Sequence, residues 1–259
     1  MTEKGREACV LAVVNQKGGV GKSTTAVNLT AALGEAGKRV LMIDMDPQGN
    51  ATSGFGLSKS QRGKCVYDAL LGEASLDELL ESHEAYPIDV APATIQLAGA
   101  EVELVTAMSR ETRLKGLIAP LKDRYDYIII DCAPSLGLLT INALTAADGL
   151  VIPIQCEFYA LEGLSKLLDS VRLVKTHLNP ELEVVGVVMT MYDSRTKLAA
   201  QVVKEVQDFF GDGAFKTLIP RSVRISEAPS FGLSILEYDS KGKGAVAYRS
   251  LAKEVMNRV

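Results

Sequence analysis

The sequence predicts an α/β fold: a mostly parallel, twisted sheet with helices on both faces. Short, continuously apolar, β-branched runs alternate with helically periodic segments along the 259 residues. Continuous apolar runs of this length are typical of strands buried on both faces. One strand-to-helix junction is rich in glycine, and ligands of such sheets bind beyond the carboxyl ends of the strands. We expect residues 1–259 to form one large domain, because the length suits a single well-buried α/β core.

The expected strands share a high content of Val, Ile and Leu between turn residues or charges. They are CVLAVVN (9–15), RVLMID (39–44), IDVAPA (88–93), YDYIIIDCA (125–133), GLVIPIQ (149–155) and EVVGVVMTMY (183–192), with FKTLIP (215–220) as a further candidate. The expected helices are 23–37, which ends at a glycine stop, and 97–121, 137–147, 160–178, 196–210 and 244–258. The least regular stretch, about 55–85, is interpreted as an insertion within the domain.

The charge distribution is uneven. The chain carries 28 Lys and Arg against 32 Asp and Glu, a net charge of −4, which is not typical of a nucleic-acid-binding protein. Residues 195–259 nevertheless hold 11 Lys and Arg against 7 Asp and Glu. A local basic patch on an acidic protein is therefore possible, and ordinary solvated charge is the alternative.

The four cysteines indicate neither a zinc site nor a disulfide framework, because none forms a CxxC pair. No signal peptide is evident and no apolar run is long enough to span a bilayer. We therefore expect a cytoplasmic protein without a membrane partner.

The run KGGVGKST (17–24) has the spacing and context of a phosphate-binding loop, because a strand precedes it and a helix follows. The backbone N–H groups of this loop and the dipole of the next helix favour phosphate oxygens. The residues whose backbone would line the loop are Gly18, Gly19, Val20 and Gly21. The sequence thus predicts a P-loop NTPase fold.

Three side chains of the loop have distinct expected roles. Lys22 places a positive charge on the β- and γ-phosphates, and the Ser23 hydroxyl is a ligand for Mg²⁺. Thr24 can donate a hydrogen bond to the α-phosphate. ATP and Mg²⁺ are therefore the expected ligands.

Carboxylates follow two of the expected strands. Asp44 and Asp46 close MIDMD, and Asp131 closes YDYIIID, the pattern of a Walker B strand. Asp131 would hold Mg²⁺ through water, whereas Asp44 and Asp46 suit metal support or the positioning of water. Helix capping or turn formation is the alternative for Asp46, and capping of the next helix is the alternative for Asp131.

The chain resembles the ParA/Soj family of chromosome or plasmid partitioning ATPases, which belong to the deviant Walker A group. The resemblance covers nearly the whole chain. Its motifs here are NQKGGVGKSTTAVNL, DMDPQGNATSGFG, IIIDCAPSLGLLTINAL, PIQCEFYALEGL, TMYDSRT and IPRSVRISEAPSFG. Cys132 and Ser135 depart from the usual Asp-Ala-Pro-Pro, and we interpret Cys132 as a small buried side chain rather than a cluster ligand.

The resemblance implies roles for the loop and switch residues. Lys17 matches the signature lysine, which reaches phosphates bound in the other subunit of an ATP-sandwich homodimer. Such a cation stabilises transition-state charge in the manner of an arginine finger. Asp46 matches the residue that orients the attacking water, and Asp44 is expected in the outer shell of the Mg²⁺ ion. Weak ATP hydrolysis would use Lys17, Lys22 and Asp46.

The resemblance also implies a base-binding segment at Pro220, Arg221 and Ser222, where relatives often have Asn in place of Ser222. Arg195 and Arg224 match residues that bind DNA non-specifically, and Lys197, Lys241 and Lys243 could extend that patch. These five residues could equally be ordinary surface charges. Phosphate contacts of this kind carry no base readout and weaken steeply with salt.

The family further implies a ParB/Spo0J-like centromere-binding partner that stimulates hydrolysis, and location on the nucleoid.

The main alternative is a MinD-like membrane-associated ATPase, which needs a lysine-rich amphipathic C-terminal helix. The ending AVAYRSLAKEVMNRV suits a helix packed on the core instead. An iron–sulfur carrier would need the missing CxxC. A tyrosine kinase would need a C-terminal tyrosine cluster. A scaffold without turnover is disfavoured by the intact Lys17, Lys22, Asp46 and Asp131. Operator-specific repression is not expected, because no helix-turn-helix extension is present.

Overall fold

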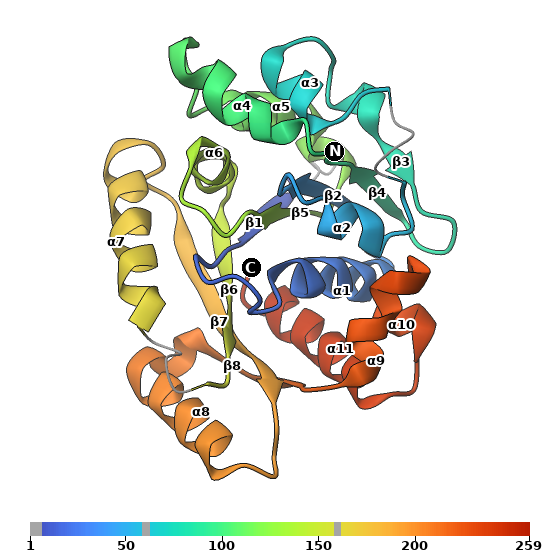
Figure 1. Ribbon diagram of the computed structural model, residues 1–259, viewed down its shortest axis with the longest axis vertical. Coiled ribbons are helices and arrows are strands. Elements are labelled where there is room, and N and C mark those ends of the chain that lie inside the picture. The colour runs from blue at the N-terminus through green and yellow to red at the C-terminus, as the bar shows by residue number, and fades with distance from the viewer. Residues whose placement is uncertain (1–6, 59–62, 158–161) are drawn as a thin grey trace, which may run out of the picture.

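The computed structural model describes residues 7–58, 63–157 and 162–259. Within these ranges, eight strands form one sheet in the order β3-β4-β2-β5-β1-β6-β7-β8 (Figure 1). All neighbouring strands are parallel except β3, which is antiparallel to β4. The strands are β1 Cys9–Val13, β2 Val40–Met45, β3 Glu81–Ser82, β4 Ile88–Ala91, β5 Tyr127–Cys132, β6 Gly149–Gln155, β7 Glu183–Tyr192 and β8 Ala214–Pro220.

Helices cover both faces of the sheet. They are α1 Lys22–Glu35, α2 Asn50–Gly54, α3 Val66–Leu71, α4 Leu97–Glu103, α5 Arg113–Ile118, α6 Leu138–Ala146, α7 Glu162–His177, α8 Lys197–Phe210, α9 Val223–Glu227, α10 Ile235–Tyr238 and α11 Lys243–Met256. The 3₁₀ turns are η1 Asp77–Leu79, η2 Leu104–Thr106, η3 Ala119–Arg124, η4 Gly211–Gly213 and η5 Ala228–Phe231.

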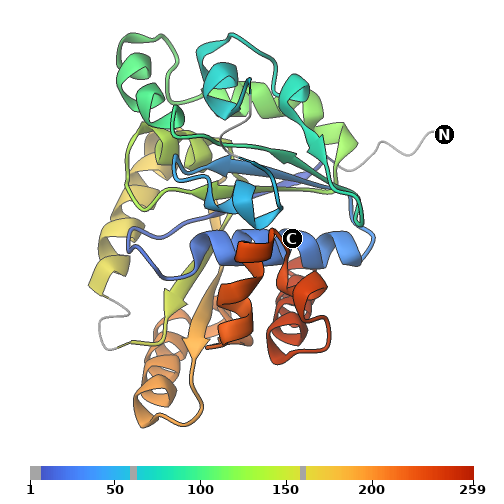
Figure 2. The same ribbon diagram turned by 45° about the vertical axis from the view of Figure 1, so that its right-hand side comes forward.

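The central strand β1 shows why two layers of helices are needed. Val10 and Ala12 belong to one core, together with residues of α3 to α8, and Leu11 and Val13 belong to the other, together with residues of α1, α2 and α9 to α11. Figure 2 shows the helices on the two sides of the sheet. All four side chains are fully buried. A strand that is apolar on both faces stays out of water only between two such layers. The predicted fold class is confirmed, and the seven expected strands are all present.

The expected single helix over 97–121 is wrong. The chain forms α4 and η2, breaks, and resumes as α5 and η3. Ser109 has a φ of 53°, a left-handed backbone that a helix cannot include. Helix α7 agrees with the helix expected over 160–178 from Glu162 onwards, and residues 160 and 161 lie outside the described residues.

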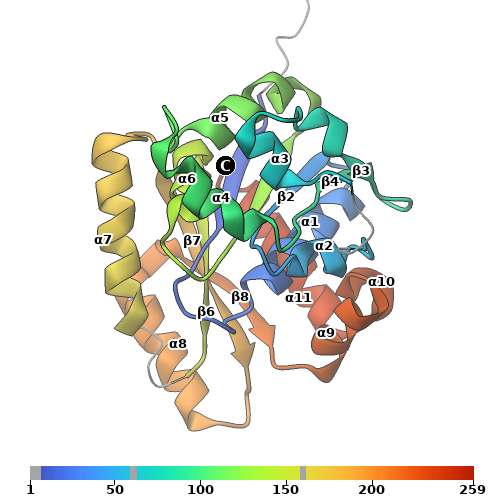
Figure 3. The ribbon, with the colours of Figure 1, turned by 45° about the horizontal axis from the view of Figure 1, so that its top comes forward.

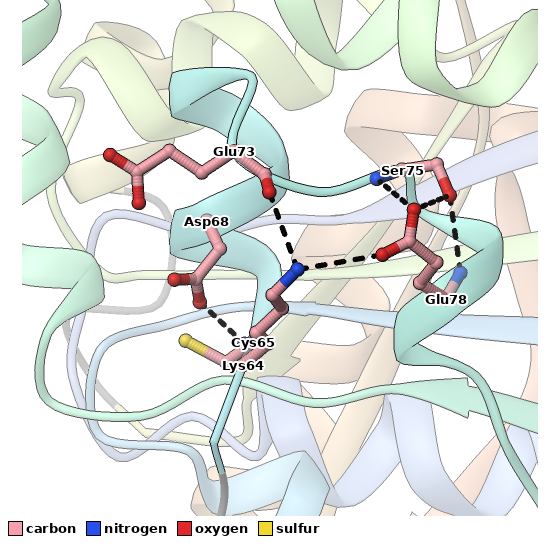
Figure 4. A network of polar contacts seen from close by, with 6 residues as sticks. All are labelled: Lys64, Cys65, Asp68, Glu73, Ser75 and Glu78. Carbon is pink, nitrogen blue, oxygen red and sulfur yellow. Dashed lines mark hydrogen bonds and ion pairs between the residues drawn. The ribbon is translucent and has the colours of Figure 1, made fainter.

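The segment interpreted as an irregular insertion has more regular structure than expected. It carries α3, η1 and β3, and α3 packs beside α4 and α5 (Figure 3). Figure 4 shows a polar network that holds it together. Lys64 Nζ contacts the carbonyl oxygen of Glu73 (3.4 Å) and Glu78 Oε2 (3.5 Å), and the Ser75 hydroxyl donates to Glu78 Oε1 (2.9 Å). Its residues 59–62 lie outside the described ranges.

Candidate functional site

The loop between β1 and α1 has the backbone of a phosphate cradle. Gly19 and Gly21 have φ of 77° and 87°, in the region that favours glycine. A Cβ on Gly18 or Gly19 would meet no other atom within 4 Å, so these positions face open space rather than packed protein. Helix α1 has no side-chain hydrogen bond at its N-cap and no acidic residue in its first turn. Its first N–H groups and its dipole therefore suit an anion.

Lys22 lies almost buried at the start of α1, with 6% of its surface exposed. Its Nζ donates a hydrogen bond to the carbonyl oxygen of Lys17 (3.1 Å). Burial lowers the pKa of Lys22, while the nearby Asp131 and Asp46 oppose that shift. A buried ammonium among acidic groups is stabilised further when an anionic ligand comes to it.

Asp44 and Asp131 are brought together by the register of two strands. β2 and β5 are adjacent and parallel, and Asp44 pairs with Asp131 across them. Asp44 is fully buried and accepts hydrogen bonds from the backbone N–H of Asp46 (3.1 Å) and from the N–H (2.8 Å) and hydroxyl (2.7 Å) of Thr52. Burial raises its pKa to about 6, against the opposing effect of the Thr52 and Asp46 hydrogen bonds. Asp44 thus anchors the loop from Asp46 to α2.

Asp131 is in a different situation. It is fully buried, and among the described residues neither carboxylate oxygen has a hydrogen-bond partner. Burial and the neighbouring Asp44 raise its pKa well above the ordinary value, and the nearby Ser23 and Lys22 only partly oppose this. Two unpartnered buried oxygens are costly, and a cation with its water shell would satisfy them.

Asp46 lies at the mouth of the loop with 6% exposure. Its Oδ1 accepts from the N–H of Gln48 (2.9 Å), and its carbonyl oxygen accepts from the N–H of Gly49 (2.8 Å). Asp46 and Gln48 line the same cavity as Gly18 and Lys22, so this tight turn lies beside the phosphate loop.

Two adjoining cavities lie beside the loop. One, of about 500 Å³, is lined by Gly18, Lys22, Ser23, Asp46 and Pro134, among others. The second, of about 380 Å³, is walled by Pro220, Arg221, Ser222, Ile225 and Tyr248, among others. Both include Gly21, Thr24 and Met191, so the two spaces meet at the start of α1.

A larger hollow of about 1140 Å³ lies at the opposite, amino end of the strands. Several of its charged groups already serve the fold. Glu254 accepts from the backbone N–H groups of Lys216 and Thr217 (both 2.8 Å), and Arg258 donates to the carbonyl oxygen of Val185 (2.8 Å). The glycine loop and Lys22 line the smaller pair of cavities, and Asp131 lies beside Lys22 and Ser23. This pair of cavities is therefore the candidate site.

The chain as a whole is similar to known proteins. The AAA domain family matches residues 8–184. The sporulation initiation inhibitor protein Soj of Bacillus subtilis is 58% identical over 95% of this chain and 97% of its own length. The chromosome partitioning protein ParA of Myxococcus xanthus is 53% identical over 96% of this chain and 88% of its own length.

The chain belongs to the ParA/Soj family of chromosome-partitioning ATPases. A solved structure has the same fold. Cobyrinic acid a,c-diamide synthase from Mycobacterium smegmatis, with bound ADP and magnesium, superimposes with a TM-score of 0.86 at 38% identity, over 96% of this chain and 94% of that one. The resemblance inferred from the motifs and the expected ATPase class are confirmed.

Within this ParA/Soj chain, the three base-segment residues occupy one wall of the second cavity. Pro220 ends β8, and the N–H of Arg221 donates to the carbonyl oxygen of Tyr192 (2.9 Å). Ser222 precedes α9 as its N-cap. The pocket also contains Met191, whose φ of 52° is unusual for a residue with a side chain. Pro220, Arg221 and Ser222 therefore line one cavity beside the phosphate loop.

The five basic residues matched to DNA binding come from three separate segments. Arg195 and Lys197 lie where β7 leads into α8, Arg224 is on α9, and Lys241 and Lys243 lie where α10 leads into α11. All five are exposed. Lys241 and Lys243 line a groove of about 430 Å³ with Pro220, next to Arg221.

Both arginines among these five residues have acidic neighbours. Arg195 donates to both oxygens of Asp193 (2.9 and 2.8 Å), and Arg195 lowers the pKa of Asp193 to about 2. Arg224 approaches Glu227 (3.6 Å) and the Tyr238 hydroxyl (3.3 Å). Asp193 thus binds Arg195 through two hydrogen bonds, whereas the contacts of Arg224 with Glu227 and Tyr238 are longer.

Sequence reasoning missed Thr52, Asn28 and Glu157. Thr52 holds Asp44 from inside α2, which was not expected as a helix. Asn28, on α1, accepts from the N–H of Ile235 (2.7 Å) and ties the phosphate-loop helix to α10. Glu157 forms an ion pair with Lys17 (3.6 Å). The Asn28 and Glu157 contacts join segments far apart in the chain, and no local pattern signals them. Thr52 follows Asp44 by only eight residues, but nothing in the sequence indicated its role.

Cys132 is fully buried, as expected, and burial raises the pKa of its thiol. All four cysteines are free. In the described part of the chain, no helix is long and apolar enough to cross a membrane, and no group of three or more His, Cys, Asp or Glu side chains is arranged to hold a metal ion.

Proposed function

We propose that this chain binds Mg-ATP, dimerises around two ATP molecules, binds DNA non-specifically as a dimer, and is reset by hydrolysis. Membership of the partitioning ATPases supports the general activity. The observation that carries the ATP site is the glycine cradle with the nearly buried Lys22 at its base. The adjoining cavities have room for the phosphates in one and the base in the other.

The residues present fit a magnesium ion. Asp131 offers two buried oxygens without partners, and the Ser23 hydroxyl lies on the same side. The absence of a three-residue cluster in the described chain suits Mg²⁺, which usually takes one or two protein ligands and completes its shell with water and phosphate. When bound, Mg²⁺ neutralises charge on the β- and γ-phosphates. Ser23 would be the direct ligand, Asp131 would act through water, and Asp44 would lie in the outer shell.

Hydrolysis would depend on side chains that the fold already holds in place around the phosphate loop. Asp46, fixed by the Gln48 and Gly49 contacts, would orient the attacking water and accept its proton. Lys22 and the loop N–H groups would hold the phosphates, and Thr24 would donate to the α-phosphate. Lys17, which is exposed, would extend to the phosphates of the second subunit and stabilise charge in the transition state.

DNA binding would use Arg195, Arg224, Lys197, Lys241 and Lys243. A dimer doubles each basic segment, and two linked sites raise apparent affinity by orders of magnitude without any new contact. ATP would then switch DNA binding on, and hydrolysis, stimulated by a ParB-like partner, would switch it off. Location on the nucleoid follows from the same DNA binding.

The test is DNA binding by the purified protein without nucleotide, with ADP, with ATP, and with ATP in the Asp46→Ala variant. Sedimentation of the same samples reports the dimer. We expect DNA binding only with ATP, in proportion to the dimer and falling with salt. ATP-dependent dimers that ignore DNA would reject the DNA step and direct attention to lipid vesicles, the MinD-like alternative.

A further inference from the structure

Lys17 shares a carboxylate with Arg221. Lys17 Nζ lies 3.6 Å from Glu157 Oε2, and Arg221 Nη2 lies 3.8 Å from Glu157 Oε1. Glu157 Oε1 also accepts a hydrogen bond from the Gln155 side chain. The three charged residues come from the loops that follow β1, β6 and β8, at the carboxyl edge of the sheet. One acidic group therefore links the signature lysine to the wall of the base cavity.

We infer that Glu157 is a positioning residue that restrains Lys17 in the monomer and releases it when the ATP dimer forms. The inference rests on the proposed function, in which Lys17 acts on the other subunit. A lysine paired within its own chain cannot at the same time place its ammonium against a partner's phosphates. In each subunit, dimer formation must therefore replace the Lys17–Glu157 ion pair by a contact between Lys17 and the phosphates bound to the partner.

Arg221 makes this exchange possible without leaving a carboxylate unpaired. Glu157 lies near the phosphate loop, where an unneutralised negative charge would oppose the phosphates of ATP. When Lys17 leaves, Arg221 remains beside Glu157 and keeps it neutralised. Glu157 thus pairs with two cations, of which Lys17 leaves on dimerisation and Arg221 remains.

The size of the restraint follows from its exposure. The side chains of Lys17 and Glu157 are 42% and 45% exposed, and such ion pairs are weak and screened by salt. Each pair changes an equilibrium by about 1.5- to 5-fold. Two pairs break for every dimer, so we expect the dimer dissociation constant to be raised by about 2- to 30-fold.

The test is sedimentation of the wild-type protein and Glu157→Gln with Mg²⁺ and a non-hydrolysable ATP analogue at saturating concentration. Glutamine keeps the size of the side chain and removes its charge. We expect Glu157→Gln to dimerise about 2- to 30-fold more tightly at low salt, and the two proteins to converge as salt screens the pair. The matched control is Glu78→Gln, which removes the exposed Lys64–Glu78 pair (3.5 Å) in the insertion. It should behave as wild type at every salt concentration.

The Arg221→Gln substitution should change the stability of the ATP dimer in the opposite direction to Glu157→Gln. With Arg221 gone, release of Lys17 would leave Glu157 unpaired, so the dimer should be weaker. Adding Glu157→Gln should remove that defect, which loss of a base contact alone would not do. Equal or weaker dimerisation of Glu157→Gln at low salt would overturn the restraint. Failure of the wild-type protein itself to dimerise with the ATP analogue would instead reject the proposed function.

Discussion

Asp44 and Asp131 lie opposite each other on adjacent parallel strands, so two fully buried carboxyls are neighbours next to the candidate nucleotide site. Their surroundings differ. Asp44 accepts three hydrogen bonds, whereas the oxygens of Asp131 have no partner among the described residues. Burial and their mutual proximity therefore disfavour the ionised form of both carboxyls, as their raised pKa values show.

Because the two buried carboxyls lie together, we expect removal of one acidic group to stabilise the folded protein. A carboxyl whose pKa is higher in the folded state stabilises the fold below its unfolded pKa, and that contribution is lost as pH rises through the folded value. For Asp44 this window runs from 3.8 to about 6, and Asp131 has a pKa raised in the same direction. Asp131→Asn should therefore raise the free energy of unfolding of the nucleotide-free protein at pH 7.5 by about 1–3 kcal/mol. The gain should shrink at pH 5.

Urea unfolding at the two pH values measures this difference. Asp123→Asn, which changes an exposed aspartate just before β5, is the matched control and should be neutral. The Asp131→Asn variant should also lose the extra stability that Mg-ATP gives the wild-type protein. A loss of stability at both pH values would mean that the Asp131 carboxylate supports the fold.

Lys22→Ala should abolish tight nucleotide binding. Lys22 supplies the buried positive charge of the cradle, and charge-assisted hydrogen bonds contribute about 1.5–3 kcal/mol, so affinity for ATP should fall by about 10- to 150-fold. Titration with a fluorescent ATP analogue gives the dissociation constant. Lys115→Ala removes an exposed lysine on α5 and should bind as wild type. Unchanged affinity in Lys22→Ala would contradict the assignment of the phosphate loop.

Asp46→Ala should separate binding from turnover. The substitution leaves the cradle and Lys22 in place but removes the carboxylate that would orient water, so ATP should be bound and hydrolysed about 100-fold more slowly or worse. The protein should then remain an ATP-bound dimer. Phosphate release and sedimentation measure the two effects. Wild-type turnover in this variant would remove Asp46 from the mechanism.

The sequence predicted the features that are local in the chain. The loop 17–24, the strand-end aspartates and the seven longer strands are coded by short patterns, because glycine spacing and apolar runs act over a few residues. The break in the helix expected over 97–121 was missed, because the left-handed Ser109 follows no glycine or proline signal. The Lys17–Glu157 and Asn28–Ile235 contacts were also missed, because they depend on which strands become neighbours.

The two arginines matched to DNA binding differ in how firmly they are held. Arg195 donates hydrogen bonds to both oxygens of Asp193 (2.9 and 2.8 Å), whereas Arg224 makes the longer contacts to the Tyr238 hydroxyl (3.3 Å) and Glu227 (3.6 Å). Both side chains are largely exposed, Arg195 to 84% and Arg224 to 61%. A phosphate competes more easily for the looser side chain. Arg224→Ala should therefore reduce DNA affinity more than Arg195→Ala, while both variants still form the ATP dimer.

The salt dependence of DNA binding gives the sharper measurement of Arg224. Removing one cation that binds a DNA phosphate lowers the slope of log affinity against log salt by about 0.9, so the dimer of Arg224→Ala should show a slope lower by about 2. Arg172→Ala removes an 80% exposed arginine on α7, outside the five proposed positions, and should leave the slope unchanged. If Arg224→Ala binds DNA with the wild-type slope, α9 is not part of the DNA face, and the contacts must come from the α8 and α11 segments.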